Sequence, residues 1–381
     1  MAVLVNGRMR SWSRPRELSD QRGIWAEIST LSTSSAKRRC RRMIGFDTIR
    51  PTRFSRKESH MKHVVLTAIS FALLLTSTSE GEAPDANVAS DSTGNVNLEQ
   101  ATLGGKQFWS DEFCYGGWRI QRNTFTGHCR LLDGENVRRA WGKFAECLNR
   151  LSELERQGEV ERMKSRVVLV LHGLGRTRSS MDKLCRHLEE HGDYTTINIS
   201  YASTRHSVAH HAAALGRIIN HLDQAEEINF VGHSLGNLVV RHYLADQTDP
   251  AKELRPDRRI LRIVMLAPPN NGSVLAVRLK KNPLFRTFWG ESGIEIAEQW
   301  GQLEKNLAVP QCEFGIIAGG RGSEPGLNPL LPGDNDLVLT VEETRLPGAN
   351  DFIVLPVSHS FIMTNQLVHQ HTLRFLEGGR F

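Results

Sequence analysis

The sequence lacks several features that would point to particular classes of protein. Its 381 residues include only six cysteines, and these follow no spacing typical of a metal site. No internal repeat is visible along the chain. The apolar run from Val64 to Leu75 is too short for a comfortable membrane span. The sequence therefore suggests neither a cysteine-based metal site nor a membrane-spanning body.

A basic surplus is missing from most of the chain, although the formal net charge is +6. Up to Lys62 the chain has 15 Lys and Arg against five Asp and Glu. The remainder has 33 basic and 37 acidic residues. Because the basic character belongs to the N-terminus, the body has no electrostatic signature of nucleic-acid binding.

The N-terminal part has the layout of a targeting region. Residues 1–60 are rich in Arg and Ser, and we interpret them as a basic disordered extension upstream of the true start. Residues 61–83 begin with Met-Lys, continue with the apolar run and end in small residues, as a signal peptide does. A short signal-anchor behind a basic tail is the alternative. Residues 84–104 are polar and aperiodic and indicate a linker. We expect export.

Two local patterns follow the linker. Residues 116–132 predict two short strands around a turn at 123–127. Residues 136–157 place apolar side chains on one face of a helix that starts near Val137. If the protein is exported, Cys114 and Cys129 could close the hairpin as a disulfide, while buried free thiols are the equal alternative.

From Arg166 onward the chain alternates strand and helix patterns. The run 167–171 is continuously apolar, as expected for a strand that is buried on both faces. Further strand patterns start near residues 195, 228, 260, 314 and 352, with helical patterns between most of them. This alternation predicts an α/β fold, a doubly wound and mostly parallel sheet with helices on both faces. Residues 105–381 form one such domain, with the hairpin at its N-terminal end.

The segment "VGHSLG" lies where a buried strand turns into a helix. A nucleophilic serine must stand on a sharp, strained turn, so only small neighbours fit two residues before and after Ser234. Gly232 and Gly236 occupy those places. The first helical residue, Leu235, would present its backbone N–H and the positive helix end to an oxyanion.

A second glycine-rich turn, "LHGLGR", follows the first long strand. Gly173 and Gly175 flank Leu174, whose backbone N–H would be the second oxyanion donor. His172 resembles a catalytic base, but we expect it to orient the loop, because it precedes the serine in the chain.

Together, "VLHGLGR", "GHSLGN" and the order of the segments resemble the lipase and esterase branch of the α/β-hydrolase superfamily, over roughly residues 167–376. The resemblance implies hydrolysis of carboxylic esters without a cofactor, and a triad ordered serine, acid, histidine. It places the acid at Asp336 and the base at His359. Asp334 is the second candidate for the acid and Asp351 the third. Leu337 stands where the family often has glycine.

The resemblance also predicts a cap at about residues 273–305. This segment mixes Phe285, Phe288 and Trp289 with basic residues. Such a cap could rest on an anionic lipid surface, or its aromatic side chains could be buried on the core. The predicted function is ester hydrolysis on a small-molecule or lipid ester. An acyltransferase or thioesterase on the same triad, and a non-catalytic binding protein with this fold, are the alternatives.

Overall fold

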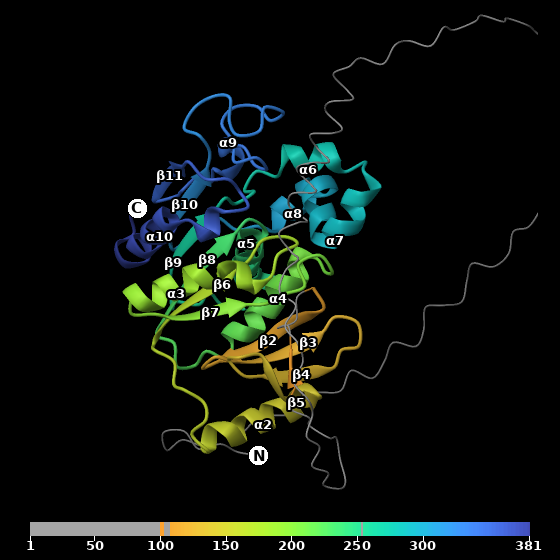
Figure 1. Cartoon of the computed structure of the whole chain (residues 1–381), viewed down its shortest axis with the longest axis vertical. Coiled ribbons are helices and arrows are strands. Elements are labelled where there is room, and N and C mark those ends of the chain that lie inside the picture. Colours follow the sequence, from red (N-terminus) through yellow and green to blue (C-terminus); the bar gives the residue numbers. More distant parts are fainter. Residues whose placement is uncertain (1–99, 103–106, 253) are drawn as a thin grey trace, which may run out of the picture. The chain divides into compact units, whose positions relative to one another are not determined.

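The computed structural model describes residues 100–102, 107–252 and 254–381 (Figure 1). The predicted N-terminal extension (residues 1–60) and signal peptide (residues 61–83) lie outside the described residues, as does most of the linker. The expectation of export, which rests on the signal peptide, therefore stays a prediction. Within the linker, Gln100–Ala101 form a short strand, β1. In the part of the chain that is described, no helix is both long and apolar enough to cross a membrane.

Six parallel strands form the main sheet, in the order β11-β10-β9-β8-β6-β7 (Figure 1). They are β6 (Arg166–Leu171), β7 (Thr195–Ile199), β8 (Glu227–His233), β9 (Ile260–Leu266), β10 (Glu313–Gly319) and β11 (Asp351–Leu355). The strand order reverses at β6, because β7 lies on one side of it and β8 on the other. In open parallel sheets, ligands bind at the carboxyl ends of the strands beside such a reversal.

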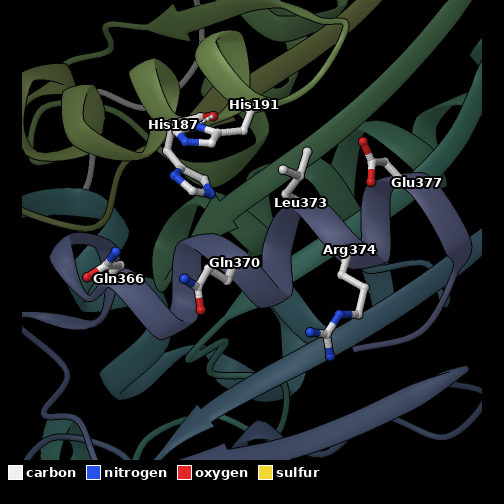
Figure 2. A pocket seen from close by; sticks show the side chains of 7 residues that line it. All are labelled: His187, His191, Gln366, Gln370, Leu373, Arg374 and Glu377. Atoms are coloured by element: carbon white, nitrogen blue, oxygen red, sulfur yellow. Dashed lines mark hydrogen bonds between the residues drawn. The ribbon is translucent and has the colours of Figure 1, made fainter.

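One face of this sheet is covered by α3 (Asp182–His191) and α10 (Gln366–Gly378). Alternate residues of β6, Val168 and Val170, pack with the buried side chains of these two helices. A hollow of about 370 Å³ lies between α3 and α10, lined by His187 and His191 of α3 and by five residues of α10 (Figure 2).

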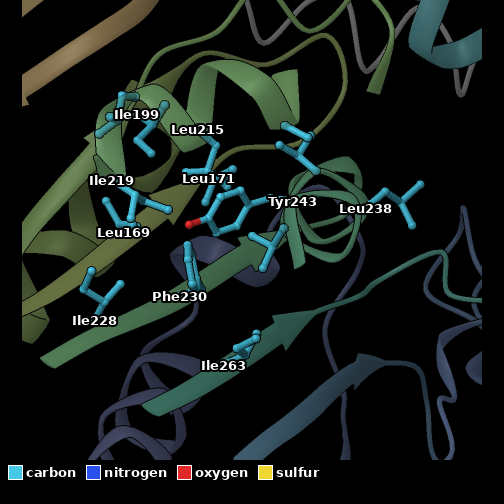
Figure 3. Close-up of a cluster of buried hydrophobic side chains, with 14 of the residues drawn as sticks. Leu169, Leu171, Ile199, Leu215, Ile219, Ile228, Phe230, Leu238, Tyr243 and Ile263 are labelled. Atoms are coloured by element: carbon cyan, nitrogen blue, oxygen red, sulfur yellow. The ribbon is translucent and has the colours of Figure 1, made fainter. Parts of the chain in front are cut away.

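The opposite face is covered by α4 (Val208–Ile219) and α5 (Leu235–Thr248). Leu169 and Leu171 of β6 point to this side and pack with Leu215 and Tyr243 in the larger core cluster (Figure 3). The side chains of β6 therefore alternate between two cores, as the pleat of a strand buried on both faces requires.

An antiparallel sheet precedes the parallel one, in the order β1-β5-β4-β3-β2. Its other strands are β2 (Trp109–Tyr115), β3 (Trp118–Asn123), β4 (Cys129–Leu132) and β5 (Val137–Gly142), and α2 (Phe144–Arg156) packs on it. The β3–β4 hairpin confirms the predicted one. The sheet is larger than the sequence indicated, and β2 joins the main domain, where Asp111 N donates to Ser200 O at 2.8 Å.

The prediction of a helix from Val137 was wrong for its first turns. Residues 137–142 form β5, which pairs with β4 on one side and with β1 on the other. Gly142 has a φ of 147°, which no helix accommodates, and Lys143 is the N-cap of α2. Two ladders of backbone hydrogen bonds outweigh the apolar spacing that suggested a longer helix.

The disulfide alternative for Cys114 and Cys129 does not hold in the structure. Both residues are buried free thiols. Cys114 belongs to β2 and Cys129 to β4, and β3 lies between these strands. Two strand spacings amount to about 9.5 Å, which exceeds the Cα separation that a disulfide allows.

The predicted cap segment is helical: α6 (Val274–Leu279), α7 (Pro283–Glu298) and α8 (Trp300–Leu303). Helix α7 is broken at Gly290, whose φ is 61°. It is attached to the start of α4, because Ser292 Oγ donates to His206 O at 2.8 Å and Glu295 accepts from Val208 N at 2.8 Å. The side chains of Phe285, Arg286 and Phe288 lie outside the described residues, so lipid-surface contact through the cap stays a prediction.

Candidate active site

Ser234 lies on a strained turn between β8 and α5. Its φ is 51° and its ψ is −118°, a backbone conformation that costs a residue with a side chain of order 1–3 kcal/mol. The turn is held because Ser234 N donates to Leu266 O of β9 at 2.9 Å. Strain of this kind persists only where the surroundings enforce it, and here it lifts the hydroxyl above the carboxyl edge of the sheet.

The glycines on either side of Ser234 have no room for a side chain. A Cβ at Gly236 would lie 2.7 Å from Leu171 O, and one at Gly232 would lie 2.9 Å from Asn237 N. The start of α5 therefore packs directly on the end of β6. This close packing is the physical reason why only glycine fits at these two positions.

Ser234, His359 and Asp336 are joined by hydrogen bonds. Ser234 Oγ is 3.0 Å from His359 Nε2, and His359 Nδ1 is 2.7 Å from Asp336 Oδ2. Because the carboxylate only accepts hydrogen bonds, Nδ1 carries the proton and Nε2 is free to accept from the serine. The arrangement can therefore remove the hydroxyl proton as the oxygen attacks.

Asp336 is fully buried and held as an acceptor. Its Oδ1 accepts from Val338 N at 3.0 Å and from Leu339 N at 2.7 Å. Its own carbonyl accepts from His359 N at 2.9 Å, so backbone and side chain both tie it to the histidine. The intervening Leu337 has a φ of 88°, which explains physically why glycine suits this position.

The two other acid candidates do not reach the histidine. Asp334 accepts from Arg321 N at 2.7 Å and Gly322 N at 2.8 Å, and so closes its own loop. Asp351 opens β11 and accepts from Phe381 N at 3.0 Å. The geometry brings only Asp336, of the three, into hydrogen-bond contact with His359.

The glycine-rich loop that contains Leu174 lies against the nucleophile. A Cβ at Gly173 would be 2.7 Å from His233 Nδ1 and 3.2 Å from Ser234 Cβ. Gly175 has a φ of 70°, and its N–H donates to Ser203 Oγ at 3.1 Å. This loop and the first residue of α5, Leu235, are thus the backbone segments that flank the serine.

His172 supports this loop from beneath. Its Nδ1 is 2.9 Å from Gly173 O, and its ring stacks on Tyr201 with centroids 4.2 Å apart. Tyr201 Oη in turn donates to the carbonyl of His172. Burial lowers the pKa of His172 to about 4, so the ring is neutral at physiological pH. These contacts hold the glycine-rich loop against Tyr201.

Sequence reasoning missed three further residues at the site. His233 Nε2 donates to His359 O at 3.1 Å and holds the backbone of the histidine loop. Gln107 joins the antiparallel sheet to the glycine-rich loop, because its Nε2 donates to Arg176 O at 2.7 Å. Arg176 Nη2 donates to Ser360 O at 3.1 Å. His233 could have been found from the sequence, because it directly precedes the nucleophile in the motif. No sequence pattern marks Gln107.

Other histidines have structural surroundings. His211 of α4 is buried, and burial lowers its pKa well below the usual value. His369 is also buried, with Nε2 2.8 Å from Met363 O. Among the described residues, no group of three or more His, Cys, Asp or Glu could hold a metal ion. The hollow of Figure 2 includes none of the residues around Ser234.

The strand order, the helices on both faces and the serine between β8 and α5 define the α/β-hydrolase fold, which confirms the predicted fold class. A family model described as a domain of unknown function (DUF7379) matches residues 139–290. None of the curated proteins compared with this chain matches it.

Solved structures of low sequence identity resemble the chain. The mature lipase BlEst2 of Bacillus licheniformis is 18% identical with a TM-score of 0.43, covering 58% of this chain and 94% of its own. Phospholipase PlaB of Legionella pneumophila is 17% identical with a TM-score of 0.43, covering 56% and 59%. The metagenomic carboxyl esterase MGS0156 is 20% identical with a TM-score of 0.38, covering 52% and 65%.

Proposed function

We propose that the protein is a serine hydrolase that cleaves carboxylic esters through an acyl-enzyme intermediate. The observation that carries the proposal is the hydrogen-bonded series from Ser234 Oγ through His359 to Asp336, with distances of 3.0 and 2.7 Å. A strained serine whose hydroxyl oxygen lies 3.0 Å from an imidazole nitrogen is activated for attack on an acyl carbon.

In the proposed reaction, Ser234 Oγ attacks the ester carbonyl while His359 Nε2 takes the hydroxyl proton. The developing oxyanion accepts hydrogen bonds from the N–H groups of Leu174 and Leu235, each worth on the order of 10²–10³ in rate. His359 then gives its proton to the leaving alcohol. Water, activated by the same histidine, releases the acid and restores the serine. Asp336 holds the imidazole in the required tautomer throughout.

Hydrolysis of a series of 4-nitrophenyl esters from acetate to palmitate tests this function, with the segment from residue 80 to 381 compared with Ser234→Ala. We expect turnover that falls at least 10³-fold in the variant, and the chain-length profile separates an esterase from a lipase. Ser292→Ala, whose hydroxyl only attaches α7 to His206, is the matched control and keeps most of the activity. Equal turnover by wild type and Ser234→Ala would rule the proposal out.

A further inference from the structure

One charged side chain at the site has no counterpart. Arg176 follows the glycine-rich loop and lies two residues after Leu174. Both backbone polar groups of Arg176 are hydrogen-bonded: N donates to Gly173 O at 3.2 Å, and O accepts from Gln107 Nε2 at 2.7 Å. The side chain therefore projects from a rigid turn.

The guanidinium spans the gap between the two loops that flank the nucleophile. Its Nη2 donates to Ser360 O at 3.1 Å, on the residue after His359. Burial lowers the pKa of both His172 and His233, and the positive charge of Arg176 lowers both further. Arg176 is thus a cation at the edge of the Ser234–His359 centre.

No carboxylate balances this charge. Among the residues that the structure describes, none forms an ion pair with Arg176, and burial alone lowers its pKa. Asp336, the carboxylate at the site, is already hydrogen-bonded to His359 and to two backbone N–H groups. A half-buried arginine whose only acceptor is one carbonyl is costly in a folded protein unless something else pairs with it.

The unpaired donors are available to a ligand. Arg176 Nε and Nη1 have no hydrogen-bond partner among the described residues and are not fully buried, so both atoms are accessible to solvent. Leu174 is only two residues away in the chain, and the guanidinium itself contacts the residue after His359. One small substrate can therefore contact both this guanidinium and Leu174 N. Arginine binds carboxylate and phosphate oxygens through two parallel hydrogen bonds.

We propose that Arg176 is a specificity-determining residue that selects esters carrying an anionic group, a carboxylate or a phosphate, a few bonds from the scissile carbonyl. This inference rests on the proposed ester hydrolysis and narrows its substrate class. The substrate anion supplies the missing partner of the arginine, and it is bound by the same loop that holds the oxyanion.

The test compares substrates that differ only in charge. Mono-4-nitrophenyl adipate and 4-nitrophenyl hexanoate place the anion in the acyl part. A 1-acylglycerol 3-phosphate and the matching monoacylglycerol place it in the alcohol part. In Arg176→Gln we expect the ratio of kcat/KM for the anionic over the neutral ester to fall about 10- to 100-fold in one pair, a fold-change typical of losing a charge-assisted hydrogen bond. That pair identifies the position of the anion.

Arg178→Gln is the matched control, because Arg178 lies two residues on and contacts Asn136 Oδ1 at 3.5 Å, away from Ser360. We expect Arg178→Gln to leave the ratio of kcat/KM for the anionic over the neutral ester within about twofold of wild type. Arg176→Lys keeps the charge and retains part of the preference. The wild-type ratio also falls as salt is raised from 20 to 500 mM, because an ionic contact is screened. Equal losses on both members of each pair in Arg176→Gln, or a ratio that salt does not change, would overturn the inference.

A second measurement separates this inference from the proposed function. Ser234 is labelled with two alkyl fluorophosphonates of equal length, one ending in a carboxylate and one in a methyl group. Faster labelling by the anionic probe, lost in Arg176→Gln, supports the role of Arg176 even if the wild type turns over none of the esters. Equal labelling rates, or none in the folded protein, count against it.

Discussion

At the scale of single residues, the geometry of the site is set by which acceptor each hydrogen-bond donor contacts. His359 Nδ1 has one carboxylate within reach, and Asp336 is locked in place by two backbone N–H groups. Asp334, two residues earlier, turns away and satisfies the backbone of residues 321 and 322. Two acidic residues of one loop thus have separate roles: Asp336 contacts the histidine, and Asp334 stabilises the loop itself.

This separation predicts opposite effects for two matched substitutions. Asp336→Asn leaves the histidine in the wrong tautomer, and we expect kcat to fall by about 10³–10⁴. Asp334→Asn keeps kcat within a few-fold and lowers the free energy of unfolding by about 1–2 kcal/mol, because charged acceptors of backbone N–H groups are lost. Initial rates on a 4-nitrophenyl ester and urea unfolding of both variants provide the comparison. A larger loss of activity in Asp334→Asn would reverse the assignment.

Much at this scale followed from the sequence, because the chemistry restricts residue type and order. The glycines around Ser234 and Leu174 and the position of His359 after a strand were such cases. Asp336 and Asp334 stayed alternatives, since hydrogen-bond partners in a loop depend on its conformation. Leu337 counted against Asp336 by pattern, yet its φ of 88° shows that the backbone has the shape that glycine usually provides.

At the scale of elements, the close approach of α5 to β6 positions the nucleophile. Helix propensity and packing make opposite predictions here, which allows a sharp test. Replacing an exposed glycine in a helix by alanine raises the free energy of unfolding by about 0.8–1 kcal/mol. At Gly236 the added Cβ would lie 2.7 Å from Leu171 O and 2.8 Å from Leu171 Cβ.

We therefore expect Gly236→Ala to lower the free energy of unfolding by about 1–3 kcal/mol through overpacking. Gly301→Ala in α8 is the control, because a Cβ there meets no atom within 4 Å, and it is neutral or slightly stabilising. Chemical denaturation of the two variants measures both effects. If Gly236→Ala were as stable as Gly301→Ala, the tight helix–strand contact would not exist in solution.

Element types were predictable where the apolar period was long and unambiguous, as in β6, β8 and α5. The helix prediction was wrong at β5 because contacts with distant parts of the chain determine the structure there. Val137, Ala140 and Trp141 satisfy a helical spacing, but strand pairing with β4 and β1 is a non-local contact that no window of sequence contains. The size of the antiparallel sheet was underestimated for the same reason.

At the scale of the whole molecule, several buried histidines make stability depend on pH. Burial lowers the pKa of His172 to about 4, and it lowers those of His211 and His233 well below the usual value. Between about pH 6.5 and pH 4 the unfolded chain binds protons at these positions and the folded chain does not. The free energy of unfolding is therefore greatest above pH 6.5 and falls on acidification, by up to about 1.4 kcal/mol per pH unit for each histidine.

Replacing one of these histidines should flatten the dependence. Both ring nitrogens of His211 lack a partner, so His211→Phe removes no hydrogen bond and reduces the slope by up to about 1.4 kcal/mol per pH unit. Substitution of the exposed His191 by Gln is the control. Urea unfolding at pH 7, 6 and 5 measures the slope. An unchanged slope in His211→Phe would mean that this ring is accessible to protons in the native protein.

The most direct test of the central claim is to map the residue that a fluorophosphonate modifies, by mass spectrometry of peptides from the labelled protein. The account predicts one modified position, Ser234, no label in Ser234→Ala and much slower labelling in His359→Ala. A label on another residue, or a folded wild-type protein that takes up none, would contradict the assignment of Ser234 as an activated nucleophile.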